Sequence, residues 1–120
     1  MKTVMLVDDS MIANFIMKKV ISNLDESLQV CDYIDSQKAL GTLSEINPTL
    51  IFLDLNMPNL DGWQFLEGMM ERNMSNKVYI LTSSTSELDR QRSSAYTNVV
   101  SFLNKPLAQE KVAAILKAAS

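Results

Sequence analysis

Residues 50–58 read Leu-Ile-Phe-Leu-Asp-Leu-Asn-Met-Pro, and this stretch decides how we interpret the fold. Its first four residues are apolar without interruption, which is typical of a strand buried on both faces. The run ends at Asp54, an acidic residue that a buried strand does not readily accommodate. Strands of this kind belong to parallel sheets that are covered by helices, so the stretch predicts an α/β fold.

Other apolar runs of similar length recur along the chain. They are Val4–Val7, Val78–Leu81 and Val99–Leu103, and Leu28–Ile34 is a more alternating candidate nearer an edge. Helical patterns separate the runs, so that strand and helix alternate five times. This order predicts βαβ units and a three-layer, doubly wound (βα)5 architecture with one parallel sheet between two layers of helices.

The predicted helices show apolar stripes at helical spacing. The stripes lie within residues 12–24, 39–46, 65–70 and 112–116, and residues 87–96 form a more polar helix. Ser86 with Asp89, and Asp61 with Gln64, are spaced as helix-capping pairs. We expect the helical methionines to fill the core, because a flexible thioether adapts to irregular gaps; they are Met11, Met17, Met69 and Met70.

Composition excludes several classes of function. The 120 residues contain no His and one Cys, which excludes a Cys/His zinc site, a disulfide framework and a histidine-activated nucleophile. A net charge of −3 argues against direct binding of nucleic acid. No run approaches the roughly 18 apolar residues of a membrane span, and Asp8 ends the first run too early for a signal peptide. We therefore expect one cytoplasmic domain over residues 1–120.

Residues suited to phosphoryl chemistry stand where the predicted strands end. Asp8 and Asp9 follow the first strand, Asp54 ends the third, and Thr82 and Lys105 follow the fourth and fifth. Ligands of open α/β sheets bind outside these carboxyl ends, so we expect the side chains to meet. Three carboxylates repel one another without a cation, and Mg²⁺ prefers oxygen ligands. With a lysine and a hydroxyl for phosphate oxygens, the set suits transfer of a phosphoryl group to an aspartate.

Each of these signals has a simpler explanation when it is taken alone. An Asp-Asp pair after a strand often marks the start of a helix, and Lys105-Pro106 is an ordinary loop dipeptide. Thr82 and the hydroxyl residues after it are typical of a turn. It is their occurrence at the ends of successive strands that favours a functional site.

From Lys2 to Ala119, the chain resembles the receiver domains of two-component response regulators, the CheY-like family. The motifs that carry the resemblance are Asp8-Asp9, Asp54–Gly62, Thr82-Ser83 and Lys105-Pro106. The resemblance implies a flavodoxin-like sheet with strand order 2-1-3-4-5. It also implies a cis peptide bond between Lys105 and Pro106.

The same resemblance implies roles for the acidic residues. Asp54 would accept a phosphoryl group from the phosphohistidine of a sensor histidine kinase or of a histidine phosphotransfer protein. Asp9 and Asp54 would bind Mg²⁺ directly, together with the backbone carbonyl of Asn56. Asp8 would act through water or by placing the ion.

Further roles concern phosphoryl contact and output. By resemblance, Lys105 would contact the phosphoryl group, Thr82 would hydrogen-bond to it, and Phe102 would stand at the aromatic switch position and rotate inward. Residues 87–96, residues 99–103 and the last helix would form the face that binds a downstream protein. Phe102 replaces the commoner tyrosine of the family.

Two alternatives remain open. One is a receiver-fold interaction module that acts without phosphorylation. The other is a haloacid-dehalogenase-like phosphatase, which carries an acid two residues after its nucleophile, where this chain has Asn56. A flavodoxin is excluded because the carboxylates of Asp8 and Asp9 would repel a flavin phosphate. We expect a signalling protein that catalyses its own modification rather than a turnover enzyme.

Overall fold

The sheet has the predicted topology. The structure is a computed structural model that describes residues 2–119. Within these residues five parallel strands pair in the order β2-β1-β3-β4-β5, which confirms the order implied by the resemblance. The strands are β1 (Thr3–Val7), β2 (Gln29–Tyr33), β3 (Leu50–Asp54), β4 (Lys77–Thr82) and β5 (Val99–Asn104).

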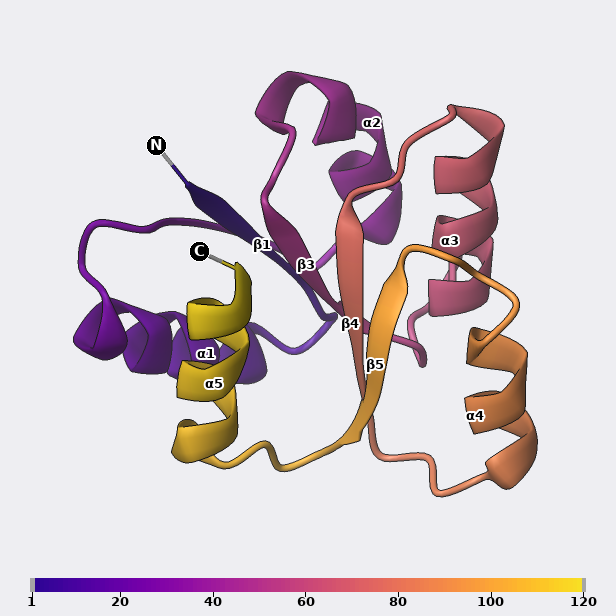
Figure 1. The fold of residues 1–120 in the computed structure, drawn as a ribbon. Coiled ribbons are helices and arrows are strands. Elements are labelled where there is room, and N and C mark those ends of the chain that lie inside the picture. Colours follow the sequence, from indigo (N-terminus) through magenta and orange to yellow (C-terminus); the bar gives the residue numbers. More distant parts are fainter. Residues whose placement is uncertain (1, 120) are drawn as a thin grey trace.

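Helices cover both faces of the sheet, as the alternation of strand and helix predicted. Figure 1 shows α1 and α5 on one face and α2, α3 and α4 on the other. None of the helices described between residues 2 and 119 is long and apolar enough to cross a membrane. The helices are α1 (Met11–Leu24), α2 (Ser36–Ile46), α3 (Gly62–Glu71), α4 (Glu87–Ser93) and α5 (Gln109–Ala119).

Two apolar cores hold the three layers together. In β1, Met5 and Val7 pack into the core that α2 and α3 cover, while Val4 and Leu6 pack into the core on the side of α1 and α5. All five residues of β3 are buried. Because consecutive side chains of a strand point to opposite faces, a strand between two cores must be apolar at every position. This explains the uninterrupted apolar run at residues 50–53.

Side-chain caps set where the helices begin. Ser10 accepts a hydrogen bond from the backbone N–H of Ala13, so α1 starts directly after the acidic pair at the end of β1. Asp61 and Gln64 form the predicted capping box at the start of α3. The predicted cap of α4 is also present, because the Ser86 hydroxyl accepts from the N–H of Asp89.

Only the second half of the apolar stripe of α1 faces the core, where Ile21 is buried and Val20 packs beside it. Asn14 and Ile21 are the buried residues of this helix. The Asn14 side chain points to the sheet because its amide donates hydrogen bonds to two backbone carbonyls there. That orientation turns the neighbouring apolar side chains outward, and they are 57–72% exposed: Met11, Ile12, Phe15 and Ile16.

The prediction that the helical methionines fill the core is half right. Met69 is fully buried, and Met17 is partly buried against the core beside α5. Met11 and Met70 are exposed, so the prediction is wrong for these two. Met11 is the first residue of α1 and lies on the side of the helix that faces solvent. Met70 follows the buried Met69 on α3, a helix that buries only one side.

Two glycines give opposite predictions for stability. An added Cβ at Gly62 would lie 2.7 Å from the Cα of Leu55 and 2.9 Å from the carbonyl oxygen of Asp54, whereas at Gly41 in α2 nothing lies within 4 Å. Gly62→Ala should therefore lower the free energy of unfolding by about 1–3 kcal/mol through overpacking. Gly41→Ala should raise it by about 0.5–1 kcal/mol, because alanine loses less backbone entropy in a helix.

Urea unfolding of both variants and the wild type at pH 7 measures these differences. Equal stability of Gly62→Ala and the wild type would show that the close approach of α3 to the end of β3 is not required.

Candidate functional site

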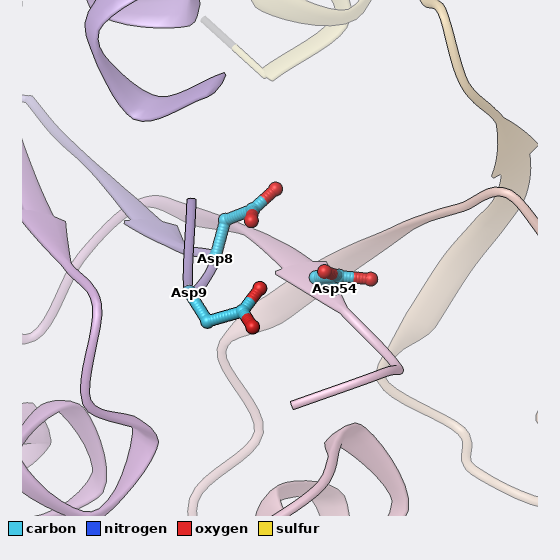
Figure 2. A group of neighbouring side chains, drawn as sticks. All are labelled: Asp8, Asp9 and Asp54. Carbon is cyan, nitrogen blue, oxygen red and sulfur yellow. The ribbon is translucent and has the colours of Figure 1, made fainter. Parts of the chain in front are cut away.

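Three carboxylates meet at the carboxyl edge of the sheet (Figure 2). One side-chain oxygen from each of Asp8, Asp9 and Asp54 lies within 4.8 Å of the other two. The register of β1 and β3 causes this, because Val7 pairs with Leu53 and the next residue of each strand emerges beside the other. Asp8 and Asp54 are only 8% and 7% exposed, whereas Asp9 is exposed. The predicted meeting of these three residues is confirmed.

Lys105 supplies positive charge to the cluster. Its Nζ lies 2.6 Å from Oδ2 of Asp8 and 3.5 Å from Oδ2 of Asp54. The peptide bond to Pro106 is cis, as expected. The backbone N–H of Lys105 donates to the carbonyl of Thr82, which ties the end of β5 to the end of β4. The lysine is thus brought to the acidic cluster, as the sequence predicted.

Thr82, the last residue of β4, and Asn56, on the loop after β3, lie beside the cluster. Thr82 is fully buried at the end of β4, and its hydroxyl accepts a hydrogen bond of 3.1 Å from the N–H of Ser84. With one lone pair occupied in this way, the hydroxyl proton of Thr82 is available to an acceptor. The N–H of Asn56 donates to Oδ1 of Asp54 at 3.2 Å. The expected role of the Asn56 carbonyl as a metal ligand stays a prediction.

Electrostatics suit the cluster to a divalent cation. Burial raises the pKa of Asp54, and the charge of Asp8 adds to this effect although Lys105 opposes it. Burial alone would lower the pKa of Lys105, but its hydrogen bond with Asp8 and the charge of Asp54 raise it. Three ionised carboxylates and one ammonium leave a formal charge of −2. A hard divalent cation with oxygen ligands matches both this charge and this donor set.

An apolar cavity of about 250 Å³ adjoins the carboxylates. Its walls come from α1 and from the segment after β5, and they include Ile16, Met17 and Leu107. Asp54 and Lys105 also line it, so the cavity is continuous with the charged cluster. The site therefore combines the charged cluster with an adjoining apolar surface.

Phe102 lies inward in the structure. Its side chain is buried in the core that α2 and α3 cover, and the guanidinium of Arg90 in α4 lies 5.0 Å from the ring centroid. Arg90 also approaches the carbonyl of Phe102 at 3.4 Å. The ring thus already occupies the inward position that the sequence analysis expected it to reach, and a switching role for it stays a prediction.

Sequence reasoning missed Asn14 as part of the site. Its side chain is 2% exposed and donates to the backbone carbonyl of Asp8, directly beneath the acidic pair. A signal was available, because Asn14 lies three and seven residues before Met17 and Ile21, on the side of α1 that turns inward.

Comparisons with known proteins identify the family and the fold of the chain. A sequence profile described as "Response regulator receiver domain" matches residues 4–117. The chain belongs to this family. The receiver is 31% identical over 106 residues to a protein-glutamate methylesterase/protein-glutamine glutaminase of Myxococcus xanthus, covering 88% of this chain and 30% of that protein.

A second relative is also longer than this chain. The nitrate/nitrite response regulator protein NarL of Escherichia coli is 28% identical over 87 residues, or 72% of this chain and 40% of that protein. The receiver therefore spans less than half the length of these two curated relatives. The methylesterase name describes a longer protein of which this chain matches one part.

Solved structures share the fold over the whole chain. The Vibrio cholerae chemotaxis protein CheY4 superimposes with a TM-score of 0.85 at 24% identity, covering 100% of this receiver and 99% of that chain. A two-component response regulator from Cytophaga hutchinsonii gives a TM-score of 0.86 at 24% identity, covering 98% and 96%. These likenesses establish the CheY-like α/β fold.

The raised pKa of Asp54 gives a prediction about stability and pH. In the unfolded chain this carboxyl ionises near 3.8, but in the folded receiver it ionises at higher pH. The unfolded state therefore loses the proton first, and wild-type stability falls as pH rises from about 4 through the folded pKa. In metal-free buffer, Asp54→Asn should be more stable than the wild type at pH 7, and the gain should shrink toward pH 4.

Asp25→Asn provides a control of opposite sign. Hydrogen bonds from Ser27 lower the pKa of Asp25, so its carboxylate favours folding above the unfolded pKa. This variant should lose a little stability at pH 7 and match the wild type in acid. Urea unfolding across pH 3.5–8 checks both variants, and an Asp54→Asn protein less stable than the wild type at pH 7 contradicts the electrostatic account.

Proposed function

We propose that this receiver, as a single unit over residues 1–120, accepts a phosphoryl group onto Asp54 and thereby changes a protein-binding surface. The donor is the phosphohistidine of a sensor histidine kinase or of a histidine phosphotransfer protein. The observation that supports this most is the position of Asp54 within an acidic cluster and 3.5 Å from the ammonium of Lys105. That set contains a nucleophile, ligands for a cation and a counter-charge for a phosphoryl oxygen.

The proposed transfer proceeds in one displacement. A carboxylate oxygen of Asp54 attacks phosphorus, and the P–N bond of the phosphohistidine breaks. The bonding electron pair leaves with the donor imidazole, which takes up a proton from solvent. The product is an acyl phosphate on Asp54 and a neutral histidine on the donor.

Mg²⁺ is the cation that best fits the donor set. It would be held directly by the carboxylates of Asp9 and Asp54 and by the backbone carbonyl of Asn56, while Asp8 acts through water or by placing the ion. Its remaining positions would be open to water and phosphate. When bound, it supplies charge stabilisation to the phosphoryl oxygens as they pass from donor to acceptor. Asp8 also accepts hydrogen bonds from Ser10 and Lys105, which leaves it less free than Asp9.

Two further residues act on the phosphoryl group. The Nζ of Lys105 offsets charge on one equatorial oxygen, and the hydroxyl of Thr82 donates to another. Because the phosphoryl group adds about −1.5 to −2 charges, it draws these donors toward Asp54. We propose that this movement reaches Phe102 and the α4–β5–α5 face, which then binds a downstream protein in the cytoplasm.

A phosphatase of the haloacid-dehalogenase type is the weaker alternative. Such an enzyme needs a carboxyl group two residues after the nucleophile, and Asn56 has none to offer. An interaction module without phosphorylation is the other alternative, but it does not explain why mutually repelling carboxylates are buried together.

Intact-mass analysis tests the proposal directly. With Mg²⁺ and acetyl phosphate, the wild type should gain a single phosphoryl adduct, because the reaction needs only the site and a small donor. Asp54→Asn, and the wild type in excess EDTA, should gain none. If the wild type gains no adduct under any condition, the interaction module becomes the better explanation.

We propose that an exposed apolar surface on α1 receives the donor protein. This α1 patch consists of Met11, Ile12, Phe15 and Ile16 together with Ile34 after β2. Met11, Phe15 and Ile34 line one common groove, and Ile16 also lines the cavity next to Asp54. The patch thus reaches from the β2 edge to the acceptor. Contiguous apolar surface of this kind marks an interaction site, and an apolar helix of the donor beside its histidine fits it.

Substitutions on the two exposed helices separate docking from chemistry. Phe15→Glu places a charge in the α1 patch and should slow transfer from a phosphorylated histidine phosphotransfer protein at least tenfold. Labelling by acetyl phosphate should stay unchanged, because the site is intact. Leu88→Glu on α4 is the control and should change neither rate; this leucine is 77% exposed, against 61% for Phe15. Equal slowing by both variants, or slowing with acetyl phosphate, contradicts docking on α1.

A further inference from the structure

We propose that Asn14 is a positioning residue for the metal site: its carboxamide holds the acidic loop, residues 8–10, in the geometry that binds Mg²⁺. The inference rests on the cation site of the proposed function and extends it to a residue of α1. The hydrogen bonds of Asn14 go to backbone carbonyls and do not reach the carboxylates or the reacting atoms. It acts through the backbone of Asp8.

The geometry around Asn14 is a closed set of hydrogen bonds. The single atom Nδ2 donates to the carbonyl of Asp8 at 3.0 Å and to the carbonyl of Tyr33 at 3.2 Å. The same Tyr33 carbonyl accepts the backbone N–H of Asp8 at 3.1 Å. The amide therefore joins α1, the end of β1 and the end of β2 at one point, and both of its hydrogens are used.

Few side chains can replace this amide. Asn14 is 2% exposed, so little water can hydrogen-bond to its two carbonyl partners if the amide is removed. A primary amide offers two hydrogens on one uncharged atom, whereas leucine offers none and serine offers one. Removing the donors leaves buried carbonyls unsatisfied, and the loop can recover hydrogen bonds only by moving.

Movement of this loop matters for the cation more than for the fold. The Asp8 carboxylate is already directed by Ser10 and Lys105, so the backbone held by Asn14 sets where that directed carboxylate lies. Asp9 is the next residue and is exposed, so its carboxylate depends on the same backbone for its place. Mg²⁺ demands near-ideal octahedral geometry, and outer-shell partners of metal ligands typically affect affinity by about 10–100-fold.

Asn98 offers a matched control for a purely structural role. It is partly buried, and its Nδ2 donates to a backbone carbonyl, that of Asn76, at 3.0 Å. Asn98 and Asn76 directly precede β5 and β4, so both lie at the amino edge of the sheet, opposite the edge that carries the acidic cluster. Asn98→Leu thus removes a hydrogen bond of the same type from another part of the molecule.

Calorimetric titration with MgCl₂ and thermal unfolding in EDTA test the inference on the full chain. Asn14→Leu should raise the Kd for Mg²⁺ by about tenfold or more, and Asn14→Ser should fall between it and the wild type. Asn98→Leu should lower the melting temperature and leave the Kd within twofold of the wild type. At Mg²⁺ concentrations that saturate Asn14→Leu, labelling by acetyl phosphate should return to the wild-type rate.

The possible failures are distinguishable. If Asn14→Leu and Asn14→Ser bind Mg²⁺ as the wild type does, the positioning role is overturned and the proposed function stands. If Asn98→Leu weakens Mg²⁺ binding as much as the Asn14 variants do, general destabilisation is the cause and the inference fails. If the wild type itself binds no Mg²⁺, the cation site of the proposed function fails first. Should Asn14→Leu not fold, Asn14→Ser decides the question.

Discussion

Repulsion among three carboxylates at one edge of the sheet is the constraint around which the receiver is organised. Parallel pairing of β1 with β3 forces Asp8 and Asp54 to emerge side by side, and both are largely buried. A lysine 97 residues further along the chain from Asp8 meets this charge at 2.6 Å. One ammonium cannot neutralise three carboxylates, so the cluster retains a formal −2 charge that favours a divalent cation.

Burial of the Asp54 carboxylate lowers the free energy of unfolding at neutral pH. Burial raises the pKa of Asp54, which means that its ionised form is held at a cost in folding free energy. A cation that binds only the folded state returns part of that cost by mass action. The surrounding structure tolerates this cost in folding free energy because β3 is buried along its whole length and anchors Asp54 between two apolar cores. Functional sites commonly show such local conflict inside an otherwise consistent fold.

The division of α1 into two sides connects the site to its surroundings. Its inward side carries Asn14, which bonds to the backbone beneath the acidic pair. Its outward side carries Phe15 and the other apolar residues of the α1 patch. One helix therefore carries both the amide that bonds to the acidic loop and the exposed α1 patch, because its inward side combines Asn14 with the buried Ile21.

Several features followed from sequence patterns without the structure. Unbroken apolar runs such as Leu50–Leu53 identified the central strands, because a strand between two helical layers must be apolar on both sides. The edge strand at 28–34 was the less certain one, since β2 is buried on fewer positions. The rotation of α1 was not predictable from periodicity, because Ile12, Phe15 and Ile16 give a regular stripe whether they face the core or a partner.

By itself, the sequence determined the order of strands and helices, the acidic and basic residues at the strand ends, and the caps that start α1, α3 and α4. These depend on local spacing and on side-chain chemistry that neighbouring residues do not alter. Only the tertiary structure decided that Asn14 joins the end of β1 to the end of β2, that Phe102 lies inward under Arg90, and that the α1 patch faces solvent. Those outcomes depend on contacts between residues far apart in the chain, and the packing of the whole molecule selects among alternatives that local patterns leave equal.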